Sequence, residues 1–265
     1  MFRCRALDVN AVRREKSTID QLLIRASRLA GEGAEAAWRA LSAFLLPPTC
    51  CLCGARGLGH GFDLCRVCHG LLPPAAAGDE DPAGFDLVLA PYRYAYPVRH
   101  FVQGLKFRGE RHYARVLGEL LARARRELDL PLPGVLVTVP LHPLRYRVRG
   151  FNQSQELARF AARALGLRVD PGCLERVIAT REQSALPPRA RRRNVRGAFR
   201  LVRLPQSMRV ALVDDVITTG STASEAARVL RRAGVERIEL WAAARAPAPG
   251  AARAAPRPDG VPGTV

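Results

Sequence analysis

The 265-residue chain is 48% hydrophobic and carries 42 lysines and arginines against 24 acidic residues, a formal net charge of +18. This composition is that of a globular protein, long enough for one sizeable α/β domain and a small module. No apolar run reaches about 18 residues, and the first residues are charged where a signal peptide would be apolar. We therefore expect a cytoplasmic protein without membrane insertion.

Arginine carries almost all of the positive charge, because Lys16 and Lys106 are the only lysines. The excess favours polyanionic partners such as nucleic acid, or anionic small molecules held by local arginine clusters. Abundant alanine, glycine and proline also indicate a GC-rich coding bias, which explains part of the arginine without any ligand. Both interpretations stay open at this point.

Changes of composition along the chain predict five regions. Residues 73–84 combine prolines, small residues and acids, which is typical of a linker, and the stretch after 246 has the proline, alanine and glycine content of a disordered tail. In chain order we expect an N-terminal extension over 1–44, a metal-binding module over 45–72, a linker over 73–84, an α/β domain over 85–245 and a disordered tail over 246–265.

A cluster of cysteines predicts the metal site. Cys50 with Cys53, and Cys65 with Cys68, form two Cys-x-x-Cys pairs, each able to present two thiolates from a tight turn. Together they supply a tetrahedral site with four cysteine ligands, for which zinc is the expected metal. The module around it is zinc-ribbon-like and too small to have a hydrophobic core of its own. The alternatives left open are Cys51 as the first ligand, His60 or His69 as substitutes, and a redox-active cysteine pair.

Periodicity predicts an α/β fold for the rest of the chain. Apolar, β-rich runs alternate with amphipathic stretches, which indicates a mainly parallel sheet with both faces covered by helices. The predicted strands are 85–90, 92–96, 135–139, 210–213 and 237–244, the predicted helices are 97–106, 111–128, 153–165 and 223–233, and a basic loop is expected over 189–196.

Two consecutive aspartates, Asp214 and Asp215, follow the strand predicted over 210–213. In an open α/β sheet, ligands bind beyond the carboxyl ends of the strands, and a loop that opens a helix offers N–H groups to an anion. The two carboxylates would repel phosphate but suit ribose hydroxyls, for which they act as hydrogen-bond acceptors. The sequence therefore predicts a sugar position at the acidic pair and a phosphate position in the loop that follows.

The loop after the acidic pair has the composition of a monophosphate site. Gly220 lets the backbone approach a phosphate closely. The hydroxyl donors around it are Thr218, Thr219, Ser221 and Thr222. The Gly-Lys-Ser/Thr element of a Walker loop is missing. A ligand-free alternative explains part of the motif, since Thr222 and Glu225 also match a helix capping box.

These features resemble the signature of type I phosphoribosyltransferases, and the chain as a whole resembles the ComF (GntX-like) competence family within that group. The resemblance covers residues 45–245 and implies a type I phosphoribosyltransferase-like parallel sheet flanked by helices, with a small N-terminal zinc module. The segments that carry it, in the family's order, are the cysteine module, 104–109, 139–142, 149–154, 183–199 and the loop over 218–222, named the phosphate loop below.

The resemblance implies a role for each part of the site. Asp214 and Asp215 would be the catalytic acidic pair and hold the ribose diol, while the phosphate loop would hold the 5-phosphate of phosphoribosyl pyrophosphate or of a nucleotide. Mg²⁺ would bridge pyrophosphate and ribose oxygens. Each arginine near the pyrophosphate also has the simpler interpretation of a solvated side chain. The candidates on that side are Lys106, His142, Arg145 and Arg149.

The implied activity is transfer of ribose 5-phosphate to a nitrogen acceptor with release of pyrophosphate, linked to DNA uptake. The alternative is a non-catalytic sensor of phosphoribosyl pyrophosphate or nucleotide, acting with single-stranded DNA and a helicase-like partner. The arginine-rich stretch 187–193 suits a phosphate backbone, but few aromatic residues flank it. A loop over the active site is therefore the competing interpretation of that stretch.

Overall fold

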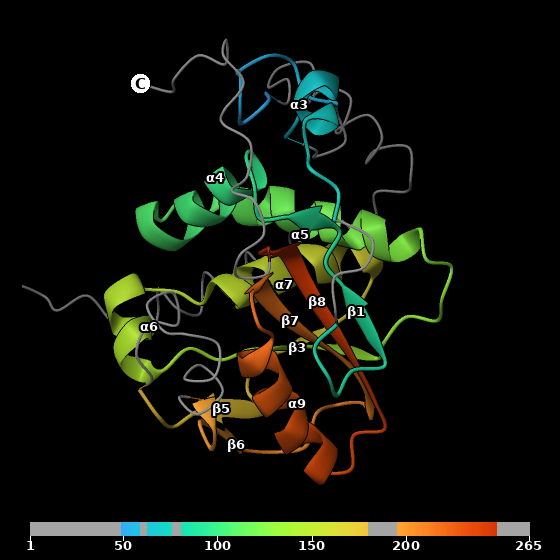
Figure 1. Ribbon diagram of the computed structural model, residues 1–265, viewed down its shortest axis with the longest axis vertical. Coiled ribbons are helices and arrows are strands. Elements are labelled where there is room, and N and C mark those ends of the chain that lie inside the picture. Colours follow the sequence, from blue (N-terminus) through green and yellow to red (C-terminus); the bar gives the residue numbers. More distant parts are fainter. Residues whose placement is uncertain (1–48, 59–62, 76–80, 180–194, 248–265) are drawn as a thin grey trace, which may run out of the picture. The chain divides into compact units, whose positions relative to one another are not determined.

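A parallel β-sheet lies at the centre of the fold (Figure 1). The computed structural model describes residues 49–58, 63–75, 81–179 and 195–247, which all belong to one compact unit. Within these residues the sheet has six strands in the order β1-β8-β7-β3-β4, with β2 also paired to β8, and every pairing is parallel. The strands are β1 (Leu87–Leu89), β2 (Tyr92–Arg93), β3 (Val135–Thr138), β4 (Val169–Asp170), β7 (Arg209–Ile217) and β8 (Arg237–Arg245).

Helices cover both faces of this sheet. The helices α5 (His112–Arg126) and α7 (Gln153–Leu165) lie on one face, and α9 (Ser221–Arg232) lies on the other (Figure 1). None of the described helices combines the length and the apolar character needed to cross a membrane. The other helices whose bounds lie within the described residues are α3 (Arg66–Gly70), α4 (Val98–Gln103), the π-helical turn η1 (Gly104–Arg108) and α6 (Pro143–Arg149).

Strand β7 shows how alternation divides the core. Ala211 and Val213 pack in the hydrophobic cluster of α5 and α7, whereas Val210 and Leu212 pack in the cluster of α9, and all four are fully buried. Successive side chains of a strand point to opposite faces, so an apolar run is what a strand covered on both sides requires. Burial on both faces fixes the register of β7 against β3 and brings their carboxyl ends to the same edge.

The cysteine module shares the core of the domain. Its Leu52, Leu64 and Leu72 are buried in the same hydrophobic cluster as Phe101 of α4 and Leu117 of α5. Burial of a leucine side chain contributes roughly 2 kcal/mol relative to exposure. The module is therefore stabilised by its contact with these helices as well as by any metal that it holds.

A short antiparallel pair stands apart from the main sheet. It joins β5 (Leu174–Arg176) to β6 (Phe199–Leu201). Residues 180–194, between these strands, lie outside the described residues, and the basic loop expected over 189–196 falls almost wholly there. The extension over 1–44, His60 and nearly all of the tail over 246–265 also lie outside the described residues.

The mainly parallel sheet with covered faces is confirmed, and the helix predicted over 153–165 matches α7. Three predictions are wrong in detail, and one of them is the strand predicted over 92–96, because β2 has only two residues. The helix predicted over 97–106 is α4 followed by a π-helical turn, and the strand predicted over 210–213 continues to Ile217. Asp214 and Asp215 therefore belong to the strand itself, which holds their backbone in the sheet.

Candidate functional site

The acidic pair lies near the carboxyl end of β7. Asp215 is 4% exposed, and Asp214 is half-buried. Asp214 Oδ1 accepts hydrogen bonds from Ser154 Oγ at 3.2 Å and from the Asp215 N–H at 2.9 Å. Asp215 Oδ1 accepts one from the Val216 N–H at 2.7 Å. These bonds orient both carboxylates without the help of a ligand.

The ionisation of Asp214 is perturbed by its surroundings. Burial and the neighbouring Asp215 charge raise the pKa of Asp214 to about 7, although Lys106 and the hydrogen bonds to Asp214 oppose the rise. Two adjacent carboxylates in a partly dry site are unfavourable when both are ionised. Asp214 therefore takes up a proton near neutral pH, and its capacity to accept hydrogen bonds from hydroxyls changes in that range.

Lys106 faces the acidic pair. Its Nζ lies 2.7 Å from Asp215 Oδ2, and the two side chains are 22% and 6% exposed. Burial alone would lower the pKa of Lys106, but the charges of Asp215 and Asp214 outweigh burial and raise this pKa. The lysine belongs to η1, and π-helical turns are frequent at functional sites. Lys106 is thus held in its charged form at the pair.

The phosphate loop joins β7 to the N-terminus of α9. Gly220 has a left-handed backbone with φ of +67°, and the helix begins at Ser221. The hydroxyls of Thr219 and Ser221 are hydrogen-bonded at 2.7 Å. Gly220, the N-cap residue, has no side chain to cap the helix, although Thr219 Oγ1 accepts a hydrogen bond from the Ser221 N–H at 3.4 Å. The helix dipole and the N–H groups of the first turn therefore face a position suited to an anion.

The capping-box interpretation of Thr222 and Glu225 is wrong, because Thr222 lies inside the helix and not ahead of it. The Glu225 carboxylate instead accepts hydrogen bonds from the Gly197 N–H at 2.7 Å and from the Arg228 guanidinium at 2.6 Å and 2.9 Å. Glu225 thus ties α9 to the turn before β6. Helix capping does not account for the hydroxyl residues of the loop.

Residues of the predicted linker pack on the phosphate loop. A side chain at position 220 would collide with Pro82, and Ser224 Oγ donates a hydrogen bond to the Ala83 carbonyl at 3.1 Å. Gly220 is therefore required for two reasons, its left-handed backbone and its contact with Pro82.

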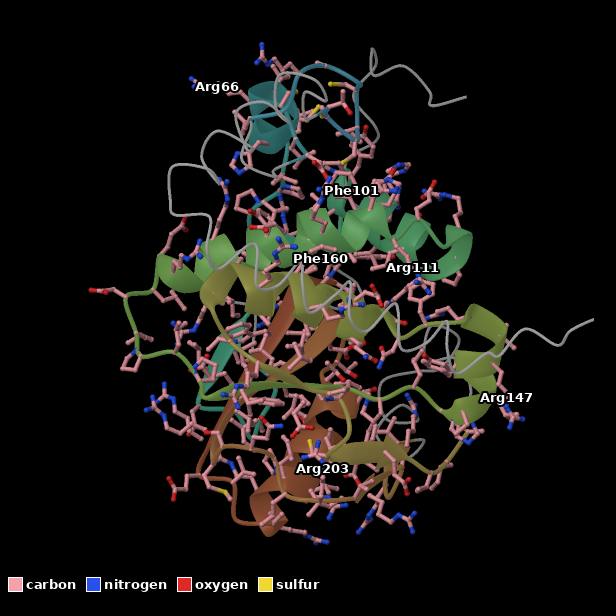
Figure 2. The ribbon with its side chains drawn as sticks, turned by 180° about the vertical axis from the view of Figure 1, so that it is seen from behind. Arg66, Phe101, Arg111, Arg147, Phe160 and Arg203 are labelled. Carbon is pink, nitrogen blue, oxygen red and sulfur yellow. The ribbon has the colours of Figure 1, made fainter. Side chains whose placement is uncertain are left out.

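A cavity of about 310 Å³ brings most of the predicted site residues together. Arg149, in the wall of this cavity, donates a hydrogen bond to Gln153 Oε1 at 2.6 Å, and its guanidinium lies 5.9 Å from the centre of the Phe107 ring. Arg147 is exposed on the outer side of α6 (Figure 2). The predicted residues that line the cavity are Lys106, Arg145, Arg149, Asp214, Asp215, Thr218, Gly220, Ser221 and Thr222.

Two predicted residues act beside the cavity and do not line it. His142 caps the N-terminus of α6, where its Nδ1 accepts a hydrogen bond from the Leu144 N–H at 3.3 Å. Thr219 supports the phosphate loop through its bond to Ser221. Both side chains position elements that do line the cavity.

Sequence reasoning did not single out several lining residues. Gln153 and Ser154 lie in the segment 149–154 that carried the family resemblance, so that segment was a signal for them. Arg176 of β5 had no signal in the sequence. It is 7% exposed, and its guanidinium lies 5.5 Å from the centre of the Phe199 ring. The unpredicted lining residues with polar or aromatic side chains are Tyr94, Phe107, Gln153, Ser154 and Arg176.

The four predicted cysteine ligands lie close enough together to hold a metal such as zinc. The Sγ atoms of Cys50, Cys53, Cys65 and Cys68 all lie within 4.8 Å of one another, and those of Cys53 and Cys65 are 3.7 Å apart. Zinc–thiolate bonds of about 2.3 Å would separate the sulfurs of a tetrahedral site by roughly 3.8 Å. The Cys68 N–H approaches Cys65 Sγ at 3.4 Å, which favours the thiolate. The donor atoms and their spacing therefore fit zinc.

The other cysteines of the described chain differ from these four. Neither Cys51 nor His69 belongs to the group among the described residues. Burial raises the pKa of Cys51 to about 12, and burial likewise raises that of Cys173 to about 12. Cys173 is fully buried and packs as a small apolar residue.

Proteins of known name resemble this chain over most of its length. DNA utilization protein YhgH of Salmonella typhi is 38% identical over 205 residues, 74% of this chain and 89% of that protein. The protein of the same name from Escherichia coli (strain K12) is 34% identical over 224 residues, 76% of this chain and 98% of that protein. Competence protein F of Haemophilus influenzae is 36% identical over 174 residues, 63% of this chain and 76% of that protein.

No protein-family model matches the chain. The solved structure of TT1426 from Thermus thermophilus is 21% identical and covers 53% of this chain and 86% of that one, with a TM-score of 0.31. A likeness of this size says nothing about function.

Proposed function

Because the chain belongs to the family of DNA utilization protein YhgH and competence protein F, we propose that it serves DNA uptake or utilization through a site for phosphoribosyl pyrophosphate or a nucleotide. The observation that carries the proposal is one cavity lined by the acidic pair, the phosphate loop and two arginines of α6. These supply acceptors for a ribose diol, donors for a 5-phosphate and positive charge for a pyrophosphate.

The proposed reaction is transfer of ribose 5-phosphate to a nitrogen acceptor with release of pyrophosphate. The C1–pyrophosphate bond breaks, the nitrogen of the acceptor bonds to C1, and the acceptor gives up its proton. In this proposal Asp214 and Asp215 hold the ribose hydroxyls, and Ser154 keeps Asp214 in place. Positive charge at Arg145 and Arg149 offsets the charge that builds on the leaving group. Positioning and charge neutralisation then supply the catalysis, without a nucleophilic side chain.

The donor set of the cavity fits Mg²⁺. The described lining residues offer carboxylate and hydroxyl oxygens, the ligands that Mg²⁺ prefers, and no thiol or imidazole. Bound together with the donor, Mg²⁺ would offset the pyrophosphate charge. Zinc instead has a structural role in the proposal, because a site with four cysteine ligands leaves no open coordination position.

A second candidate function is a non-catalytic accessory protein that binds the same ligand and acts on single-stranded DNA with a helicase-like partner. The names of the relatives favour a role with DNA. The arginines on the exposed surface, such as Arg147 of α6, would contact the phosphate backbone. DNA binding that persists at raised salt, without pyrophosphate release, would favour this candidate over the enzyme.

The test is calorimetric titration of the zinc-loaded protein with phosphoribosyl pyrophosphate and Mg²⁺. The wild type is compared with Asp214→Asn/Asp215→Asn, and pyrophosphate release is assayed in the same samples with pooled nucleobases. Binding lost in the double variant supports the site, and pyrophosphate release supports the transferase. Folded, zinc-loaded wild-type protein that binds neither phosphoribosyl pyrophosphate nor nucleotides would overturn the proposal.

A further inference from the structure

The segment 81–86, named the strap below, lies against the phosphate loop and has no task in the proposed function. It follows the cysteine module in the chain and ends directly before β1. Pro82 packs on Gly220 in the loop. The Ala83 carbonyl accepts a hydrogen bond at 3.1 Å from Ser224 Oγ, which belongs to the first turn of α9. The strap therefore touches both the loop and the helix that the loop opens.

Both ends of the strap are anchored to β8. The Asp81 carboxylate accepts a hydrogen bond from the guanidinium of Arg245, a residue that is 9% exposed. Arg245 pairs in the sheet with Ile217, the last residue of β7. Asp86 bonds to Ile238 twice, since its N–H donates at 2.9 Å and its carboxylate accepts at 2.7 Å. The strap is thus fixed without the help of a ligand.

These contacts restrain the phosphate loop at its start, in its middle and at its end. The strap reaches the last pair of β7 and β8, the glycine of the loop and the first turn of α9. Gly220 lacks the side chain that would restrict its backbone, so the loop depends on a neighbour to hold one conformation. Backbone N–H groups bind an anion tightly when they already point toward it, because ordering a loop on binding costs free energy.

We propose that the strap is a positioning element of the phosphate site, in which Pro82 and Ala83 hold the phosphate loop in the conformation that binds the 5-phosphate of the ligand. The inference rests on the proposed function and extends its site to residues outside the cavity. Among the described residues that line the cavity, none belongs to the strap. The strap therefore acts through the loop, and it should affect the phosphate of the ligand without affecting pyrophosphate.

The test combines two measurements on the zinc-loaded protein. Calorimetry gives the affinity for ribose 5-phosphate, and mass spectrometry follows hydrogen exchange in residues 218–222 of the ligand-free protein. The variant is Pro82→Gly, and its matched control is Pro74→Gly, because Pro74 lies in the same predicted linker but is bridged to Tyr92 of β2. Pro82→Ala keeps the Cβ atom that faces Gly220, so it should fall between wild type and Pro82→Gly.

Pro82→Gly should weaken binding of ribose 5-phosphate about 10-fold and speed exchange in the loop, with binding of inorganic pyrophosphate and Mg²⁺ unchanged. Pro74→Gly should match wild type in all three measurements. The proposal is overturned if Pro82→Gly binds ribose 5-phosphate as tightly as wild type, if it weakens both ligands equally, or if exchange in the loop is unchanged. Faster exchange in Pro82→Gly alone, in a protein whose wild type binds no ribose 5-phosphate, would refute the proposed function and leave the strap as the support of the loop.

Two further variants test the contacts themselves. In Gly220→Ala the new methyl group overlaps the ring of Pro82, and Gly220→Ala/Pro82→Gly gives that group room. The double variant should therefore lose less affinity than the product of the two single losses, and independent losses would overturn the contact. If Pro82→Gly does not fold, as judged by thermal unfolding, Ser224→Ala removes the hydrogen bond to Ala83 from the helix side. It should weaken ribose 5-phosphate binding about 5-fold, and wild-type affinity would overturn the proposal.

Discussion

Replacing Lys106 by methionine keeps the aliphatic stem and removes the charge that faces the acidic pair. The broken contact is the 2.7 Å ion pair with Asp215, whose partners are 22% and 6% exposed. Removing one partner of a buried ion pair costs about 3–5 kcal/mol, and surface pairs contribute about 0–1 kcal/mol. Because Lys106 is partly exposed, we expect a loss of about 2 kcal/mol in the free energy of unfolding near pH 8.

This loss should shrink as the pH falls. Without Lys106, the folded-state pKa of Asp214 would rise further above its ordinary value. The folded protein would then hold a proton that the unfolded chain releases, so the variant loses stability as pH rises through the folded pKa and regains it at lower pH. Urea denaturation at about pH 5.5 and about pH 8, followed by the fluorescence of buried Trp241, measures the difference.

Arg108→Met is the matched control, since Arg108 lies in the same π-helical turn and pairs with Glu110 at 2.8 Å. Its pair is 46% and 34% exposed, so its loss should cost less than about 1 kcal/mol and depend little on pH. A cycle with Asp215→Asn isolates the coupling of Lys106 to its partner. Equal losses for Lys106→Met and Arg108→Met, or additive effects in the cycle, would refute the assignment of Lys106 to the site.

Three further outcomes are expected. Affinity for ribose 5-phosphate should rise as pH passes about 7, because Asp214 accepts hydrogen bonds from the ribose hydroxyls when it is ionised. Asp214→Asn should remove this dependence of the affinity on pH, and an unaltered dependence would contradict the assignment of Asp214 to the ribose. Gly220→Ala should weaken binding of ribose 5-phosphate about 10-fold, because Pro82 and the left-handed backbone both resist a side chain at this position. Gly234→Ala is the control: its backbone is also left-handed, but a side chain there would meet no neighbouring atoms, so binding should be unchanged. Chelation of zinc should speed hydrogen exchange in residues 49–72 and α4 but not in β7 or β8, as measured by mass spectrometry. Exchange rates that chelation leaves unchanged in all of these segments would contradict a structural role for the metal.

The acidic pair and the phosphate loop could be predicted because they are local in sequence. The two carboxylates lie in β7, and the hydroxyl residues and the glycine follow in the loop and at the start of α9. Here the order of residues along the chain is also their order in space. The cysteine pairs are predictable for the same reason, because each Cys-x-x-Cys turn presents two thiolates wherever it packs.

Arg176 and the partner of Lys106 could not be predicted, because both depend on contacts between distant segments. Arg176 belongs to a strand of three residues, too short for a periodic signal, and its place follows from pairing with β6 across a long intervening stretch. The periodicity near Lys106 predicts a helix but not the extra residue of a π-helical turn. That turn contains Gly104, where a side chain would collide with Tyr113 of α5, so tertiary packing shapes it.

The topology of the sheet also sets when the cavity can form during synthesis. Strand β8 lies between β1 and β7, and it is the strand to which β1 pairs in the described sheet. A chain emerging from the ribosome therefore carries β1 and β7 as open edges until β8 has been made. Such edges can pair with other chains, and contacts between distant segments form slowly. A nascent chain stalled before β8 should consequently be unable to bind ligand and should be a target for chaperones.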